Sequence, residues 1–192
     1  LLTGSNASGK STFLKTVAIN AIIAQSLNTC IATSYKASFF QIYSSMALKD
    51  NLQGSESYFI VEIKSLKRIL SHAEDKLPML CFVDEVLRGT NTLERIAASS
   101  QILKSLAREN VLCFAATHDL ELTQILEDEY SNYHFQEEIR DNDVLFNYQL
   151  YKGRAVSRNA IQLLRIIGYD PSIIEHAEYT AAHFLETGEW RL

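Results

Sequence analysis

Apolar residues along this chain occur in two patterns, short continuous runs and longer stretches with helical spacing. The segments "LLTG" at 1–4, "PMLCFVDE" at 78–85 and "VLCFAATHD" at 111–119 contain continuous runs followed by polar residues. Such runs are typical of parallel strands that are buried on both faces. Helical spacing follows the first run, in residues 13–22, and recurs in "SYFIVEIKSLKRIL" at 57–70. The alternation predicts an α/β domain with a mostly parallel sheet flanked by helices.

The last part of the chain has a different pattern. Over residues 130–151, aromatic and aliphatic residues alternate with polar ones on either side of "RDND". This alternation around a turn sequence predicts a hairpin that extends the sheet. Two helices are expected after it, at about 158–167 and 171–186, because Gly168 and Pro171 divide two stretches with helical spacing.

The segment "GSNASGKSTF" at 4–13 joins the first predicted strand to the first predicted helix. It fits the pattern G-x-x-x-x-G-K-[ST], whose glycines allow the backbone to wrap a polyphosphate at the positive end of a helix. The flanking strand and helix favour this interpretation over a chance glycine turn with a surface lysine. The sequence therefore predicts that ATP is bound by Gly4, Ser5, Asn6, Ala7, Ser8, Gly9, Lys10, Ser11 and Thr12.

Particular side chains of this predicted site have distinct expected roles. Lys10 is expected to reach the β- and γ-phosphates, Ser11 to ligate Mg²⁺, and Thr12 to hydrogen-bond the α-phosphate. Asp84 and Glu85 end the second apolar run, at the edge where open α/β sheets bind ligands. We expect Asp84 to hold Mg²⁺ and Glu85 to activate the attacking water as general base. An "Asp-Glu" pair at the end of a strand is common and is weak evidence by itself. Together with the phosphate loop, it indicates hydrolysis of the bound nucleotide.

His118 follows the third apolar run, so it is expected at the same sheet edge as the two carboxylates. There it could hydrogen-bond the γ-phosphate, which would make it catalytic together with Glu85 and Lys10. A strand-end histidine with an ordinary structural partner is the alternative.

The helical stretch at 57–70 is preceded by Gly54-Ser55-Glu56-Ser57. Serine and glycine at a helix start can form an anion site, or they can simply cap the helix. The phosphate loop already supplies one cradle for ATP. A second one suggests that ATP is shared between two subunits, with Ser57 reaching the nucleotide of the other chain.

Composition and charge indicate the kind of domain and the cellular compartment in which this predicted site lies. The 192 residues suit one α/β domain, and the net charge of −5 argues against a main nucleic-acid surface within it. The scattered cysteines Cys30, Cys81 and Cys113 indicate a reducing compartment, without a disulfide framework or metal site. No signal peptide or membrane span is evident, so we expect a cytoplasmic protein. The chain starts with leucine inside a strand, which we interpret as part of a longer protein.

These motifs, in this order, resemble the ATPase domain of the MutS family of DNA mismatch repair proteins, over nearly the whole chain. "TGSNASGKSTF" looks like the family's phosphate loop, and "FVDEVLRGTNT" is similar to its acidic strand and the turn after it. "DNLQGSESYFIVE" looks like its signature segment, with Ser57, Phe59 and Glu62 in register. "FAATHDLELT" and "YKGRAVSRNAIQLLRIIGYDPSIIEHA" are similar to two later segments of the family.

The resemblance implies a P-loop NTPase fold of the ABC and MutS type. It implies that residues 1–192 form one ATPase domain, with a nucleotide-binding core at 1–150 and a C-terminal helical dimerisation segment at 151–192. A homodimer or a MutS-like heterodimer would share ATP and Mg²⁺ between subunits. DNA would be bound through regions outside this chain, so that ATP turnover is coupled to mismatch or DNA-structure binding.

Several residues depart from the family pattern and indicate a divergent member. They are Ala7 and Ser8 in the phosphate loop, Gly54 and Ser55 in the signature, Asn91 in the turn, and Asn159 and Ala160 near the C-terminus. The residues with expected chemical roles remain, namely Lys10, Ser11, Ser57, Asp84, Glu85 and His118.

Three other functions remain possible from the sequence. An ABC-type ATPase for transport or chromosome maintenance also binds ATP between two subunits, but it usually carries a different signature sequence and an inserted helical arm. A P-loop kinase would explain Lys10 and Asp84, but not Ser57, "RGTNT" or His118. A binding module with an inactive site is disfavoured by the intact Lys10 and Glu85.

Overall fold

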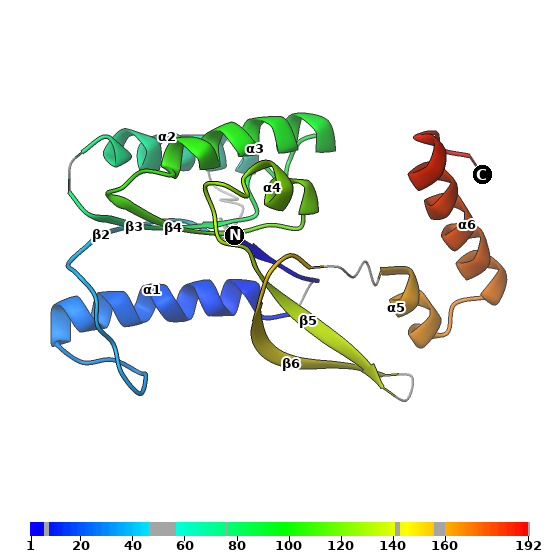
Figure 1. Ribbon diagram of the computed structural model, residues 1–192, viewed down its shortest axis with the longest axis horizontal. Helices are drawn as coiled ribbons and strands as arrows, with labels where there is room; N and C mark the ends of the chain where they lie inside the picture. The colour runs from blue at the N-terminus through cyan, green and yellow to red at the C-terminus, as the bar shows by residue number, and fades with distance from the viewer. Residues whose placement is uncertain (6–7, 47–56, 76, 141–142, 156–159, 192) are drawn as a thin grey trace.

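The structure, a computed structural model, describes residues 1–5, 8–46, 57–75, 77–140, 143–155 and 160–191. Helices and strands alternate along its first two thirds (Figure 1). The strands are β1 (Leu2–Thr3), β2 (Gln41–Ser45), β3 (Met79–Asp84), β4 (Val111–Ala116), β5 (Tyr133–Arg140) and β6 (Asp143–Lys152). The helices are α1 (Lys10–Leu27), α2 (Tyr58–Ala73), α3 (Thr92–Leu106), α4 (Leu120–Ile125), α5 (Ala160–Ile167) and α6 (Pro171–Thr187).

These strands form one sheet in the order β2-β3-β4-β1-β5-β6. All neighbouring pairs are parallel except β5 and β6, which form an antiparallel hairpin. Because β4 lies between β1 and β3, the carboxyl ends of these three strands meet at one edge of the sheet. The polar residues that follow β1, β3 and β4 are therefore brought together.

Helices cover both faces of the parallel part of the sheet (Figure 1). Helix α1 lies on one face, and α2, α3 and α4 lie on the other. The side chains of β3 alternate accordingly: Met79, Cys81 and Val83 belong to the core on the α2 and α3 side, whereas Leu80 and Phe82 pack with α1. Burial on both faces explains why this strand is a continuous apolar run in the sequence.

Helices α5 and α6 stand beside the sheet and pack mainly against each other (Figure 1). An ion pair of 2.8 Å joins Arg165 to Glu178 across this pair. Helix α6 begins after Asp170, whose side chain accepts the Ser172 backbone N–H, and it has proline in its first turn. Apolar side chains remain exposed on both helices and the link between them, including Ile167, Tyr169, Ile173 and Tyr179.

The α/β architecture expected from the sequence is confirmed, and so are the hairpin and the two C-terminal helices. Within the hairpin and before α5, residues 141–142 and 158–159 lie outside the described residues. Strand β2, with the sequence "QIYSS", was not predicted because it has few apolar residues. In the described part of the chain, the helices are too short or too polar to cross a membrane.

Candidate functional site

The loop between β1 and α1 depends on glycine at both of its ends. Gly4 has φ 143° and Gly9 has φ 107°, conformations that side chains strongly disfavour. A Cβ on Gly4 would lie 2.8 Å from the carbonyl oxygen of Phe135, and one on Gly9 would lie 3.2 Å from the ring of Tyr148. The loop can therefore follow this path only without side chains at these positions. Asn6 and Ala7, two of the expected phosphate contacts, lie outside the described residues.

Lys10, the first residue of α1, folds back across this loop. Its Nζ donates hydrogen bonds to the carbonyl oxygens of Gly4 at 2.8 Å and Ser5 at 2.7 Å. Only 5% of the residue is exposed. Burial lowers the pKa of Lys10, and the carboxylates of Glu85, Asp84 and Glu137 oppose that shift. A buried cationic group thus lies in the concave side of the loop.

Asp84, the last residue of β3, has an unused acceptor. It pairs in register with Ala116 of β4, at the edge of the sheet that also carries the glycine loop. Its Oδ1 is buried and accepts no hydrogen bond from the described residues. Buried carboxylate oxygens normally have a partner, and a hard cation such as Mg²⁺ or a water molecule of its shell is a suitable one.

Glu85 is held from two sides just beyond the end of β3. Its Oε1 lies 2.9 Å from Nε2 of His118, and its Oε2 lies 2.7 Å from a guanidinium nitrogen of Arg88. The backbone N–H of Glu85 donates to the carbonyl of Ala116 at 2.9 Å. The structure thus joins His118 to the expected general base, whereas its contact with a γ-phosphate stays a prediction.

A cavity of about 610 Å³ connects the glycine loop to Glu85. Lys10, Ser11 and Thr12 line it on one side, so three expected phosphate and metal contacts share one space with the expected base. Aromatic rings of Phe135 and Tyr148 supply another wall. Tyr148 has φ 52° and a side chain that is largely exposed, and sequence reasoning missed it because hairpin alternation does not reveal such a turn in the backbone.

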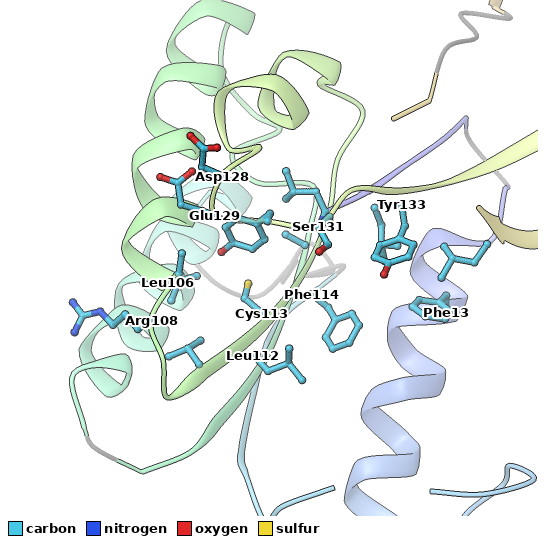
Figure 2. Close-up of a pocket in the computed structure, with 17 residues that line it drawn as sticks. Phe13, Leu106, Arg108, Leu112, Cys113, Phe114, Asp128, Glu129, Ser131 and Tyr133 are labelled. Atoms are coloured by element: carbon cyan, nitrogen blue, oxygen red, sulfur yellow. The ribbon is translucent and has the colours of Figure 1, made fainter. Parts of the chain in front are cut away.

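A larger cavity of about 840 Å³ lies elsewhere, along β4 and the segment between α4 and β5. Figure 2 shows its lining, with Leu112, Cys113 and Phe114 from β4 and Tyr133 at the start of β5. Its charged residues, Arg108, Asp128 and Glu129, do not include the residues expected to act on a nucleotide. The smaller cavity is the better candidate, because it gathers a buried cation, hydroxyls and an oriented carboxylate.

Ser57 occupies a separate position, at the start of α2. It is the N-cap residue of this helix, and its backbone carbonyl accepts from Ile60 and Val61, but its side chain caps no backbone N–H. It is exposed, and among the described residues it is not part of the cavity at Lys10. Gly54, Ser55 and Glu56 lie outside the described residues. The structure therefore does not unite Ser57 with the phosphate loop of its own chain.

Comparison with known proteins relates nearly the whole chain to one family. The family model described as MutS domain V matches residues 1–185. The chain is 29% identical over 178 residues to the DNA mismatch repair protein MutS of Thermus thermophilus, covering 92% of this chain and 22% of that protein. It is 32% identical over 189 residues to MutS protein homolog 4 of Homo sapiens, covering 93% and 20% respectively. A MutS of Bartonella tribocorum is 32% identical over 193 residues, 98% of this chain and 21% of that protein. The chain spans about a fifth of the length of these relatives.

Proposed function

This chain belongs to the MutS domain V family, and we propose that it is the ATP-binding and ATP-hydrolysing unit of a MutS-like protein. One observation carries the proposal: buried Lys10, hydroxyl-bearing Ser11 and doubly held Glu85 line a single cavity at the carboxyl edge of the sheet. A P-loop NTPase site needs a phosphate cradle, a metal ligand and a group that activates water, and this cavity offers all three.

The phosphates of ATP would lie along the glycine loop. The first backbone N–H groups of a helix have no partner within the helix, and the helix dipole favours negative charge there, so the start of α1 is suited to bind phosphate. Lys10 now donates to the carbonyls of Gly4 and Ser5, so its ammonium is already oriented within the loop. Phosphate oxygens would replace one or both of these acceptors, and Thr12 would donate to the α-phosphate.

Mg²⁺ would be held by Ser11 and Asp84. The Ser11 hydroxyl lines the cavity, and the buried Oδ1 of Asp84 has no hydrogen-bond donor among the described residues. When bound, the cation would neutralise charge on the phosphates. Ser11 and Asp84 would fix its place, directly or through water.

Hydrolysis would use Glu85 to accept a proton from the attacking water. Its carboxylate is oriented by His118 on one oxygen and by Arg88 on the other. An oriented base reduces the reorganisation that proton transfer requires. His118, at the end of the strand between β1 and β3, would also lie near the γ-phosphate.

The adenine base would rest against the aromatic wall of the cavity. Tyr148 lies over Gly9 and stacks on Phe146, with ring centroids 6.1 Å apart. Its largely exposed ring provides a flat apolar surface at the outer end of the phosphate loop. Stacking on such a ring binds a base without reading its hydrogen-bonding edge.

The active form would be a dimer that shares ATP between its subunits. Ser57 would contact the γ-phosphate bound by the other chain; in support, the residue is exposed and does not line the cavity of its own chain. Residues 1–150 would form the nucleotide-binding core, and α5 and α6 within 151–192 would dock on the partner subunit through their exposed apolar residues. Other parts of the assembly would bind DNA, and this DNA binding would be coupled to ATP turnover.

Lys10→Ala tests the nucleotide site directly. We expect ATP binding to weaken by about 100-fold or more, because a buried charge-assisted contact to two phosphates is lost. Equilibrium binding of ATP to the natural protein that carries this chain would measure it. Lys104→Ala, which removes an exposed lysine of α3 paired with Glu129, is the matched control and should bind ATP like the parent. Equal ATP affinity of the Lys10 variant and the parent would refute the site.

A further inference from the structure

Helix α2 is packed against the turn that follows the expected general base. The Oε1 atom of Glu62 accepts the backbone N–H of Leu87 at 2.5 Å. One helical turn earlier, the ring of Phe59 lies against Gly89, where an added Cβ would come within 3.1 Å of it. Two side chains of α2 thus hold the turn between β3 and α3.

This turn has a backbone that requires support. Glu85 has φ 58° and Leu87 has φ 56°, and both are side-chain-bearing residues in the left-handed region. Such residues persist where surrounding contacts stabilise them. The support on one side of Leu87 is the carboxylate of Glu62, and on the other side Ser99 Oγ donates to the carbonyl of Val86 at 3.3 Å.

Glu62 is an unusual choice for a purely structural contact. Only 4% of the residue is exposed, and its Oε2 is buried without a hydrogen-bond partner among the described residues. Burial raises the pKa of Glu62, the Leu87 N–H opposes this shift, and the nearby charge of Glu85 adds to it. A buried carboxylate with one partner costs stability, so the contact is more easily explained by what it orients than by what it adds to folding.

We propose that Glu62 is a positioning residue for Glu85: by holding the Leu87 N–H, it fixes the left-handed turn that directs the Glu85 carboxylate toward the cavity. The inference rests on the proposed ATPase function. The same helix carries Ser57 at its N-cap, so one rigid element joins the residue expected to reach the partner's ATP to the turn that carries the base. A shift of α2 along its axis would move both together.

Three substitutions of Glu62 distinguish the effect of its hydrogen bond to Leu87 from the effect of its charge. Glu62→Gln keeps an oxygen that can accept the Leu87 N–H, Glu62→Asp keeps the charge on a shorter side chain, and Glu62→Leu keeps neither. In the natural protein that carries this chain, we expect the kcat of Glu62→Gln to be within about threefold of the parent. The kcat of Glu62→Asp and of Glu62→Leu should be at least about tenfold lower than that of the parent. The Kd for ATP should stay unchanged in all three, because Glu62 does not line the cavity.

Amide hydrogen exchange supplies a readout that does not depend on activity. Exchange of the Leu87 N–H should be at least about tenfold faster in Glu62→Asp and Glu62→Leu than in the parent, and close to the parental rate in Glu62→Gln. Ile69→Ala, which creates a cavity in the same helix away from the turn, is the control for general destabilisation. It should lower the melting temperature but leave kcat and the Leu87 exchange rate near those of the parent.

The outcomes distinguish this inference from the function on which it rests. The positioning role is overturned if Glu62→Gln, Glu62→Asp and Glu62→Leu all have the same kcat. It is also overturned if Ile69→Ala lowers kcat as much as Glu62→Asp and Glu62→Leu do. A parent protein without ATP turnover refutes the proposed function, and the Leu87 exchange rate then still decides whether Glu62 holds the turn. If Glu62→Leu does not fold, the comparison of Glu62→Asp with Glu62→Gln gives the same decision.

Discussion

Nε2 of His118 lies 2.9 Å from Oε1 of Glu85, although the two residues are 33 positions apart in the sequence. The contact follows from the sheet, in which β3 and β4 are neighbours and Asp84 is in register with Ala116. The residues just beyond these strands therefore meet at one edge. Because Arg88 binds the second oxygen, the Glu85 carboxylate is oriented from both sides.

Loss of the Glu85 carboxylate should slow hydrolysis of ATP strongly but preserve ATP binding. We expect Glu85→Gln to bind ATP with parental affinity and to hydrolyse it about 10²- to 10⁴-fold more slowly, because the amide cannot accept the proton. His118→Ala should lower kcat less, by about tenfold, because Arg88 still orients the base. Single-turnover hydrolysis and equilibrium ATP binding measure the two effects. Glu74→Gln, at an exposed site after α2, is the control, and parental turnover in Glu85→Gln would contradict the assignment.

The path of the phosphate loop should not tolerate a side chain at Gly4. Gly4→Ala places a Cβ against the Phe135 carbonyl in a backbone conformation of φ 143°, so we expect a loss of about 2–4 kcal/mol in the free energy of unfolding. Chemical denaturation measures this loss. Gly153→Ala is the matched control, since Gly153 also has positive φ, 107°, but nothing lies within 4 Å of its added Cβ. It should lose only about 1 kcal/mol, and equal losses would show that contact at Gly4 is unimportant.

Sharing of ATP between subunits predicts recovery of activity in mixed dimers. Ser57→Arg and Lys10→Ala should each be inactive alone, because every composite site in either homodimer lacks one required residue. A heterodimer of the two has one site with both residues intact, so each heterodimer should regain up to about half of the parental ATPase activity, which is about a quarter for an equimolar mixture that pairs at random. Steady-state phosphate release measures this recovery.

The control for this mixing experiment is Ser71→Arg, an exposed serine near the other end of the same helix. It should be active without mixing, since its side chain is remote from the start of α2. If heterodimers form but activity does not return, Ser57 is only an N-cap residue and the shared-site model is wrong.

The burial of Glu62 predicts a pH-dependent gain in stability for Glu62→Gln. The pKa of Glu62 is raised in the folded protein, so the ionised form is disfavoured there. The stabilising contribution of the protonated Glu62 side chain is therefore complete below the unfolded-state pKa and is lost as pH rises through the folded-state pKa. Glu62→Gln should be more stable than the parent near pH 7, and the difference should decrease toward acid. A difference that increases toward acid would contradict this sign.

Much of this arrangement could be predicted from the pattern of the sequence. Strands β3 and β4 are long apolar runs, of which the first ends in Asp84 and the second is followed by Thr117, so the sequence predicts their ends at the same sheet edge. The glycine pattern around Lys10 likewise predicted a loop between a strand and a helix. These features are local, because each depends on residues that are close together in the chain.

The features that were missed depend on contacts between distant segments. Tyr148 approaches Gly9 only because β5 pairs with β1 and the hairpin has an irregular register near Phe135. Glu62 was in register with a family segment, but its bond to Leu87 requires α2 to pack on a turn 25 residues away. Strand β2 has too few apolar residues to be recognised, and it is held by pairing with β3.

The position of β4 between β1 and β3 also sets a length. Neighbouring strands are about 4.8 Å apart, so the ends of β1 and β3 are separated by about 10 Å, with the end of β4 midway. The sheet therefore fixes the spacing of the two strand ends from which the loop at Lys10 and the turn at Glu85 begin. The loop and the turn can change conformation, but the points at which they leave the sheet stay at this spacing. A conformational change at this site would therefore have to occur in the loop or in the turn, since the sheet holds the strand ends at this spacing.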